Sequence, residues 1–415
     1  MGFQQGLSGL NSSSRALDVI SNNVANASTV GFKEGNAIFA DVYASALTGA
    51  TSSIQVGIGS RVAAVYQKFT EGPLNTTNNP LDVAINGNGF FVIRRYDGTT
   101  AYTRNGQLDI NKAGYIVTPT GEQVLGYKAD DTGFIPSSGG TIEPLFVPRN
   151  EIEPKATTRF DINAANLSAD ATLPTVTPFD PANVDSYSYT TSEPVFDSLG
   201  GKHSLSVFFV RTGINPSEWD VHAVLDGDAT TDKVLGTSPS LSFDGYGKLS
   251  PPPGLLNYTV GPLANGAANL NINVDLDKVT QFGSPFSIND KSQDGYTSGQ
   301  IAGLVISTDG VIQGRYTNGQ TKNLGQIALA TFRSDQGLVS LGDNLWAETP
   351  ESGSAVVGRP STGLNGVVSA GQVEESNVDL TDELVKMIIQ QRNYQANAQS
   401  IRTQDQILQT LVNLR

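Results

Sequence analysis

Apolar residues recur with helical spacing at both ends of the chain, over residues 1–24 and 375–415. In the C-terminal stretch they follow alternating steps of three and four residues, interrupted only at Gln391 and Asp405. The N-terminal stretch follows the same steps, with two serines at the missing positions. This spacing places one narrow apolar stripe along a helix, as in a coiled coil. The predicted stripe residues are Phe3, Leu7, Leu10, Leu17, Val24, Leu380, Leu384, Met387, Tyr394, Ala398, Ile401, Leu408 and Val412.

The pattern alone leaves two partners open for these stripes. An apolar helical stripe most often packs inside its own domain, whereas stripes at both ends of a chain also suit association between subunits. The C-terminal segment would be roughly 60 Å long as a helix, so a pair of such helices would expose much apolar surface in one subunit. We therefore expect residues 1–24 and 375–415 to be largely disordered in a monomer and to fold on assembly.

Between the ends the pattern changes to short apolar stretches separated by Gly- and Asn-rich turns. Asn86-Gly87 lies between two apolar runs, which is a strong hairpin signal, and similar turns follow every 8–10 residues or so. Residues 147–187 are rich in proline, and a second strand-rich stretch follows them. From about residue 291 the first style of turn returns. The sequence therefore predicts one β domain interrupted by an inserted second one.

We predict a mainly β protein with α-helical termini. The ends form an inner coiled-coil domain (1–24 and 375–415), and 25–72 with 363–374 form a spacer or hinge. A discontinuous middle β domain comprises 73–146 and 291–362. An inserted outer β domain, a sandwich or barrel, comprises 147–290.

The chain is acidic, with 26 Lys and Arg against 40 Asp and Glu and a net charge of −14. Nucleic acids and anionic lipid surfaces require a basic face, so the charge argues against both partners. No run of 18 apolar residues occurs, which argues against membrane insertion. The N-terminus lacks a basic segment followed by a continuous apolar one, so we expect no cleaved signal peptide.

Catalytic patterns are lacking in the sequence. The chain has no cysteine and two histidines, His203 and His222, which are not spaced as metal ligands. Gly87-Asn88-Gly89 begins like a dinucleotide-binding loop, but a hairpin explains it better. A carboxylate-pair hydrolase stays open, although no pattern points to one. We therefore expect no enzyme activity, no catalytic or metal-binding residues and no cofactor.

The run from Asn22 to Lys33, Asn-Asn-Val-Ala-Asn-Ala-Ser-Thr-Val-Gly-Phe-Lys, closely resembles the signature that follows the N-terminal helix in bacterial flagellar rod and hook proteins. Residues 81–91, 102–106, 324–332 and 374–394 resemble further stretches of the same family, in the same order. The positions taken as the signature are Asn22, Asn23, Asn26, Thr29, Gly31, Phe32 and Lys33.

Within this family the inserted segment resembles hook members more than the shorter distal rod members, chiefly through Glu-Pro-Val-Phe-Asp-Ser-Leu-Gly at 193–200. The resemblance implies a structural subunit of an extracellular, curved, hollow tube that works as a universal joint between rod and filament. It implies export through the flagellar type III apparatus. The implied partners are other copies of the chain, rod proteins, and the hook cap and hook–filament junction proteins.

Functions of other classes predict different behaviour. A secreted adhesin or carbohydrate-binding module would share the acidity and the β content, but it would not need helical stripes at both ends. It would bind glycans saturably as a monomer. A distal rod protein is the nearest rival within the family and would form a straight polymer.

Overall fold

The computed structural model describes residues 2–43, 57–136, 140–214, 217–227, 234–237, 240–251, 255–261 and 263–413. The chain folds as two compact units. The first unit comprises Met1–Pro148, Gly303–Arg315 and Thr321–Arg415, and the second comprises Arg149–Ala302 and Tyr316–Gln320. The protein is mainly β with a helix at each end, as the sequence predicts.

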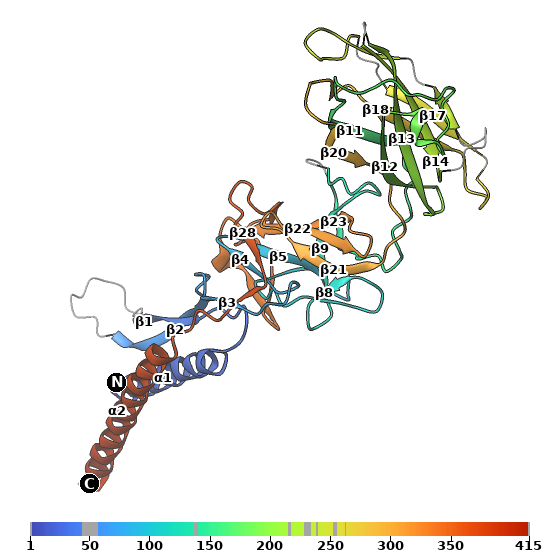
Figure 1. The fold of residues 1–415 in the computed structure, drawn as a ribbon. Helices are drawn as coiled ribbons and strands as arrows, with labels where there is room; N and C mark the ends of the chain where they lie inside the picture. The colour runs from blue at the N-terminus through green and yellow to red at the C-terminus, as the bar shows by residue number, and fades with distance from the viewer. Residues whose placement is uncertain are drawn as a thin grey trace. The chain divides into compact units, whose positions relative to one another are not determined.

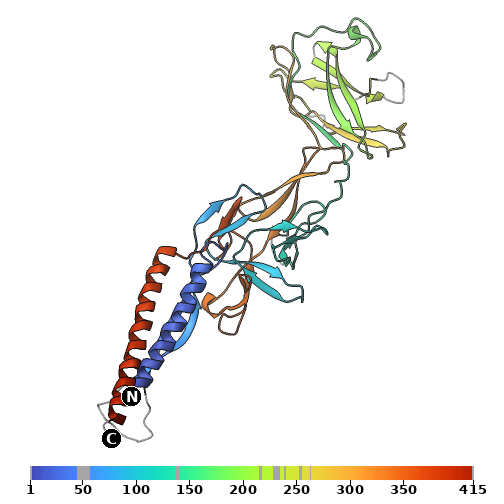
Figure 2. The same cartoon turned by 90° about the horizontal axis from the view of Figure 1, so that it is seen from below.

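The two terminal helices, α1 (Gly2–Ala25) and α2 (Leu380–Asn413), lie side by side and antiparallel in the first unit (Figure 2). Gly6 near the start of α1 lies against Ile401, and Asn23 near its end bonds to Glu383. Both segments are thus helical within one chain. That these segments are largely disordered in a free monomer in solution stays a prediction.

Helix α2 begins at Leu380, five residues after the start of the predicted C-terminal segment. Asp379 caps it, because its Oδ1 accepts hydrogen bonds from the backbone N–H groups of Thr381 at 2.8 Å and Asp382 at 3.2 Å. Residues 375–379 before it are not helical, and the Glu375 N–H donates to the carbonyl of Pro73 at 2.9 Å. This backbone contact holds 375–379 on the β structure and not in the helix.

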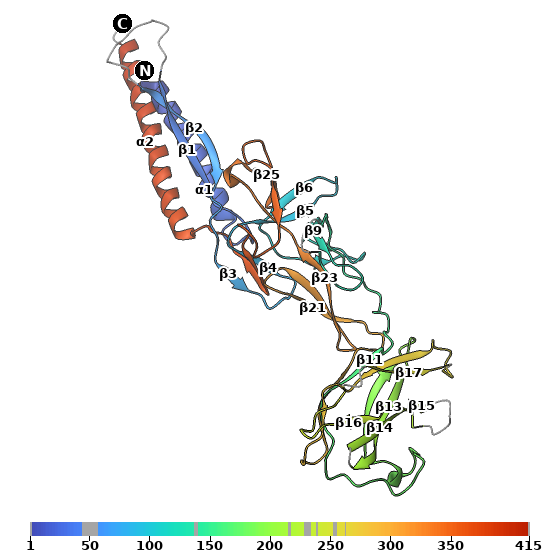
Figure 3. The ribbon, with the colours of Figure 1, turned by 90° about the horizontal axis from the view of Figure 1, so that it is seen from above.

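An antiparallel hairpin of β1 (Gly35–Tyr43) and β2 (Gly57–Gln67) runs along α1 (Figure 3). The Gln5 side chain donates to the Gly57 carbonyl at 2.7 Å, and the Ser12 hydroxyl donates to the Ser60 carbonyl at 3.2 Å. The sequence placed these strands in a spacer of low periodicity. In the structure they form a regular hairpin, and its polar contacts cover one face of α1.

The rest of the first unit is a β domain (Figure 1). Its largest sheet has 13 strands among the described residues, with the central order β21-β22-β23-β9-β5-β6-β26-β25. These strands are β5 (Phe90–Arg94), β6 (Thr100–Thr103), β7 (Asp109–Ile110), β8 (Ile116–Val117), β9 (Gln123–Lys128), β10 (Ile142–Pro144), β21 (Ile301–Ile306), β22 (Val311–Tyr316), β23 (Thr321–Ile327), β24 (Leu329–Thr331), β25 (Val339–Gly342), β26 (Leu345–Ala347) and β27 (Val356–Gly358). A short 3₁₀ turn, η2, spans Asp335–Gly337.

Aromatic side chains fill the core of this domain. Phe69 meets Phe90 and Trp346 edge-on, with ring centroids 5.4 and 5.0 Å apart. Phe90 and Trp346 are buried with Val92 and Leu338 in one apolar cluster. Phe69 follows β2 directly, so the hairpin that lines α1 is anchored in the β core.

Two small sheets join the C-terminal part of the chain to the same domain. Strand β28 (Val367–Ala370) pairs with β4 (Val83–Asn86), and β29 (Gln372–Glu374) pairs with β3 (Leu74–Thr76). Residues 363–374, which the sequence assigned to the spacer, are therefore largely strand-paired to the middle domain.

The second unit contains two five-stranded sheets, ordered β17-β18-β11-β19 with β20 beside β11, and β12-β13-β14-β15 with β16 beside β14. Their inner faces share one apolar core that includes Phe160, Phe209, Trp219 and Ile272. The elements are β11 (Arg159–Asn166), η1 (Val184–Ser186), β12 (Tyr189–Phe196), β13 (Lys202–Ile214), β14 (Ser217–Leu225), β15 (Val234–Thr237), β16 (Leu241–Phe243), β17 (Leu255–Val260), β18 (Leu270–Asp275), β19 (Val279–Thr280) and β20 (Ser287–Gln293).

This second unit extends past residue 290, where the sequence placed the end of the inserted domain. Strand β20 crosses that position and pairs with β11. Beyond it, Tyr296 bridges to Lys155 and Gly299 bridges to Ile152. These long-range pairings, which no local pattern announces, hold residues 291–302 in the second unit.

Candidate assembly interface

Small residues line the face of α1 that meets α2. A Cβ atom added at Gly6 would lie 3.0 Å from the Ile401 side chain, and one added at Gly9 would lie 2.8 Å from that of Asn397. Residues at the same three- and four-residue spacing share this face. They are Ser13, Ala16, Ile20 and Asn23, and all four are buried. This small-residue seam, Gly6 to Asn23, allows close approach of the two helices.

The predicted apolar stripe of α1 lies on a neighbouring face, roughly 90° around the helix from the seam. Phe3 and Leu7 are 47% and 44% exposed, whereas Leu10, Leu17 and Val24 are half-buried. The stripe is therefore not the main contact between α1 and α2. Only Phe3 and Leu7 keep a large exposed apolar surface, and the assignment of the stripe to an interface between subunits stays a prediction.

The predicted stripe of α2 likewise has some half-buried and some exposed residues. Ile401 packs against Gly6, and Met387 and Ala398 are also half-buried. The remaining stripe residues are exposed, namely Leu380, Leu384, Tyr394, Leu408 and Val412. The buried Glu383 and the polar Asn397 take places toward α1 that apolar spacing did not predict.

The sequence reading missed a second group of apolar residues on α2. Val385, Ile388 and Ile389 are each about half exposed, and they adjoin Leu384 on the side roughly opposite α1. We call Leu384, Val385, Ile388 and Ile389 the α2 outer face. The coiled-coil pattern detects a single apolar stripe on a helix. It therefore does not detect the second apolar side of α2. Such an exposed cluster is typical of a protein–protein contact.

The signature residues lie where α1, the hairpin and the start of α2 meet, here called the signature junction. The Asn23 side chain exchanges two hydrogen bonds with the backbone of Gly35, at 2.8 and 2.9 Å, and donates to Glu383 of α2 at 3.0 Å. Asn23 is buried, so its amide needs hydrogen-bond partners within the protein, and these three bonds supply them.

Lys33 is the cation of a fully buried ionic group. Its Nζ lies 2.5 Å from Oε1 of Glu374, and the other carboxylate oxygen accepts from Nη1 of Arg104 at 3.2 Å. Lys33 and Glu374 side chains have no exposed surface. Burial lowers the pKa of Lys33, and the negative charge of Glu374 opposes that shift. The group ties the N-terminal signature to the C-terminal segment and to the β domain.

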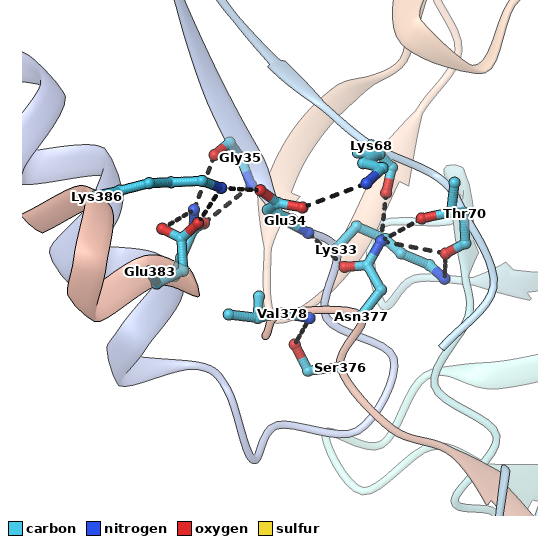
Figure 4. Close-up of polar contacts among 11 residues, drawn as sticks. Lys33, Glu34, Gly35, Lys68, Thr70, Ser376, Asn377, Val378, Glu383 and Lys386 are labelled. Atoms are coloured by element: carbon cyan, nitrogen blue, oxygen red, sulfur yellow. Dashed lines mark hydrogen bonds and ion pairs between the residues drawn. The ribbon is translucent and has the colours of Figure 1, made fainter. Parts of the chain in front are cut away.

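A second polar group extends from the junction to α2 (Figure 4). Lys386 donates to Glu34 at 2.9 Å and to Glu383 at 2.6 Å. Burial opposes protonation of Lys386, but these two bonds outweigh it and raise its pKa. Asn377 accepts from the Glu34 N–H at 2.7 Å and donates to the Lys68 carbonyl at 2.7 Å.

Gly31 is the signature position with the strictest backbone requirement. Its φ is +72°, and an added Cβ would lie 2.7 Å from the backbone N of Asn105. Its N–H donates to the Glu374 carbonyl at 2.8 Å. A glycine is therefore required both by the left-handed conformation and by the close approach of a neighbouring chain segment.

The other signature residues shape the turn after α1. Asn26 donates to the Asn22 side chain at 2.6 Å, and Thr29 donates to Asn26 at 3.2 Å. The Phe32 N–H donates to the Thr29 carbonyl, and the Phe32 ring is half-buried. These bonds hold the turn between α1 and the hairpin in shape.

Four family models match the chain in order along its length. The model described as flagella basal body rod protein matches residues 3–33, and that of the flagellar hook protein FlgE/F/G D1 domain matches 84–168. The flagellar basal body protein FlaE D2 domain matches 166–296, and the flagellar basal body rod FlgEFG protein C-terminal model matches 369–414.

Full-length relatives agree with these matches. The flagellar hook protein FlgE of Escherichia coli (strain K12) is 41% identical, with 100% of each chain covered. The chain belongs to the flagellar hook protein family. The FlgE of Borreliella burgdorferi is 32% identical over 99% of this chain and 98% of its own.

A solved structure supports the fold of the hook protein family for this chain. The crystal structure of Helicobacter pylori flagellar hook protein FlgE2 aligns with a TM-score of 0.53, covering 72% of this chain and 99% of the other. At 15% identity this likeness concerns the fold alone.

As a member of the hook protein family, the chain is a structural subunit of the flagellar hook, and this family is not a family of enzymes. His222 stacks on Phe179 with ring centroids 4.1 Å apart, as a packed side chain. In the described ranges no cluster of three metal-ligating side chains occurs. No helix there is long and apolar enough to span a membrane.

Proposed function

We propose that this chain polymerises head-to-tail through its terminal helices into a curved, hollow tube that transmits torque from the rod to the filament as a universal joint. The observation that carries the proposal is the α2 outer face, four adjacent apolar side chains that are each 44–51% exposed beside an already formed helix pair. Phe3 and Leu7 add apolar surface on α1.

The contacts between copies are head-to-tail, because a closed two-fold contact would end in a dimer. Burying the apolar helix faces supplies the driving force for assembly. Each copy offers one helix surface to a neighbour while its seam stays filled within the chain. The terminal helices are thus the fixed inner part of the polymer.

Bending requires copies on the inner curve to lie closer together than those on the outer curve. The β domains, which are poor in charge and rich in Gly, Asn and Thr, slide on their neighbours through wet contacts. The described parts of the spacer, 25–43, 57–72 and 363–374, act as a rigid connection and not as a hinge. The reason is that Lys33 and Glu374, one from each segment, form a buried ion pair.

The proposed partners are other copies of the chain, rod proteins, the hook cap and hook–filament junction proteins. The proposed route is export through the flagellar type III apparatus to an extracellular position in the hook. No cofactor and no nucleic acid take part.

Electron microscopy of the purified chain tests this function, with a chain lacking residues 375–415 beside it. We expect curved tubes from the full chain and none from the truncated one. Straight tubes would point to a rod protein. A full-length chain that stays monomeric and binds glycans saturably would overturn the proposal in favour of a binding module.

A further inference from the structure

Asn-Gly pairs occur at six places in the chain, and the fold holds them differently. An asparagine followed by glycine is especially prone to spontaneous deamidation, because glycine lacks a Cβ that would hinder the approach of its backbone nitrogen to the asparagine side chain. The six pairs begin at Asn86, Asn88, Asn105, Asn265, Asn318 and Asn365, all among the described residues. Since the pairs share the same two residues, differences between their rates report chiefly on the structure around them.

The chemistry of deamidation sets two structural requirements. The glycine nitrogen loses its proton and attacks Cγ of the asparagine, the bond from Cγ to Nδ2 breaks, and ammonia leaves a succinimide ring behind. Water then opens the ring at either carbonyl, which gives aspartate or isoaspartate with a new negative charge. The reaction therefore requires an asparagine side chain that is free to turn and a glycine N–H that is not held by an acceptor.

Hydrogen bonds hold both reacting groups at three of the pairs, those of Asn265, Asn318 and Asn365. In each, the side-chain amide donates to an oxygen of the protein and the glycine N–H donates to a backbone carbonyl. The acceptors of the three side chains are, in that order, Asp197 at 2.5 Å, the Thr297 carbonyl at 2.7 Å and the Arg359 carbonyl at 3.0 Å. The acceptors of the three glycine N–H groups are the carbonyls of Leu263, Tyr316 and Asn88, at 3.0, 3.0 and 2.7 Å.

Two further pairs are held in part. The Oδ1 atom of Asn105 accepts from the Gln107 N–H at 3.0 Å, which fixes that side chain on the backbone. Asn86 is the last residue of β4 and pairs with Val367 of β28. Closing a succinimide ring at Asn86 would have to turn its backbone out of the strand.

Asn88 is the pair with the fewest restraints. It lies in the bend between β4 and β5, outside the paired strands, and it is exposed. Neither its side chain nor the N–H of Gly89 donates a hydrogen bond to another described residue. One bond holds its backbone, since the Asn88 carbonyl accepts from the Gly366 N–H at 2.7 Å. Both requirements of the reaction are thus met at Asn88.

We propose that Asn88 is a site of spontaneous covalent modification, where the folded chain acquires aspartate and isoaspartate while the other five pairs persist. Asn88 lines a pocket of about 660 Å³ together with the buried Arg104, so the new charge appears on the wall of that pocket. Isoaspartate also adds a chain atom and turns the carbonyl that meets Gly366 into a free carboxylate. The modification therefore marks the age of a folded chain at one turn beside the signature junction.

Peptide mapping of the folded, full-length chain during incubation at mildly alkaline pH tests this inference. Fragment ions in mass spectrometry separate Asn86 from Asn88, and methylation by an isoaspartyl methyltransferase detects isoaspartate. We expect Asn88 to deamidate about tenfold faster than Asn265, Asn318 and Asn365, because each of those must first break two hydrogen bonds. The same chain in guanidinium chloride is the control, and there the six rates should become similar.

The outcomes separate the fold from the local sequence. A rate at Asn88 in the folded chain no higher than that at Asn265 would overturn the inference. A lead of Asn88 that persists unchanged in guanidinium chloride would also overturn it, since the sequence and not the fold would then set the rate. These measurements use the monomer, so they do not depend on the proposed function.

A matched pair of variants tests where the charge appears. Asn88→Gln keeps an amide on an exposed turn but closes a ring much less readily, so the folded variant should not gain the acidic form seen by isoelectric focusing. Asn318→Gln, at a hydrogen-bonded pair, should gain it at the rate of the parent. Equal accumulation of the acidic form in Asn88→Gln and in the parent would contradict the assignment to Asn88.

Discussion

The signature junction and the α2 outer face lie on either side of the start of α2 and are opposite in character. In the junction, charged groups such as Lys33 and Glu374 are fully buried and paired within one chain. On the outer face, apolar residues such as Ile388 are half exposed and have no cover. The difference separates two roles: the junction holds parts of one subunit together, and the outer face is where we propose that other copies bind.

Glu374→Gln is expected to have the largest effect on the folded chain. It removes the buried carboxylate that both Lys33 and Arg104 contact, and breaking a buried ion pair from one side costs about 3–5 kcal/mol. Urea unfolding followed by peptide-resolved hydrogen exchange in the first unit measures this loss. Glu375→Gln, the neighbouring more exposed carboxylate, should change stability by less than about 0.5 kcal/mol. Equal effects of the two would show that the buried group does not hold the junction.

Gly31→Ala should be the next most damaging change. Both Gly31 and Gly371 have φ of +72°, so an alanine at either meets the same backbone strain, about 1–2 kcal/mol. An added Cβ clashes with Asn105 only at Gly31, since nothing lies within 4 Å of one at Gly371. We expect Gly31→Ala to be clearly less stable than Gly371→Ala in chemical denaturation. Matching losses would mean that the close approach of the two segments is relaxed at little cost.

A smaller, pH-dependent effect is expected in the second unit at His203. Both ring nitrogens face carboxylates, Asp226 at 2.8 Å and Asp197 at 3.1 Å. Burial opposes the charge, but these bonds prevail and raise the pKa of His203. The stability it adds is therefore full below its unfolded pKa, about 6.5, and is lost as pH rises through the raised folded pKa.

Comparison of the parent chain with His203→Gln between pH 6 and pH 9 measures this effect. The difference in their unfolding midpoints should be larger at pH 6 and shrink toward pH 9. The comparison also removes the contribution of His222, whose pKa is lowered by burial and which acts in the opposite direction. A difference that is constant with pH would contradict a charged His203.

At acidic pH, ionised Asp197 should contribute to the stability of the second unit. Burial opposes its ionisation, but hydrogen bonds from Asn265, His203 and the backbone of Gly201 and Leu199 lower its pKa to about 2. Its contribution is present above the unfolded pKa of about 3.9 and is lost as pH falls toward 2. Asp197→Asn should therefore lose stability relative to the parent at pH 6 and approach it near pH 2, as followed by circular dichroism.

Local patterns predicted much of this molecule. Helical spacing located both terminal helices, and the Asn-Gly turns predicted a β middle with a second β region inserted in it. The cap at Asp379 is a local signal that would have placed the start of α2 correctly. The buried ionic group of Lys33 was not predicted, because its other members, Arg104 and Glu374, lie 71 and 341 residues away from Lys33 and no spacing rule links them.

The small-residue seam of α1 was not predicted for a different reason. Gly6, Gly9 and Ser13 follow the same three- and four-residue steps as the apolar stripe, but apolar residues alone were counted. A close helix contact favours small side chains over large ones, so the filled seam is the less hydrophobic of the two faces. Of the large apolar residues on α1, Phe3 and Leu7 are the ones that stay exposed.

We propose that the α2 outer face binds other copies and adds little to the stability of the single subunit. Ile388→Asp tests it most directly, with Tyr246→Asp as a control that also replaces an exposed apolar residue by a charge. Sedimentation of assembled material and the unfolding midpoint of the monomer are measured together. We expect Ile388→Asp to abolish tubes and to leave the unfolding midpoint of the monomer nearly unchanged, whereas the control should assemble. Normal tubes from Ile388→Asp, or loss of the folded monomer, would contradict it.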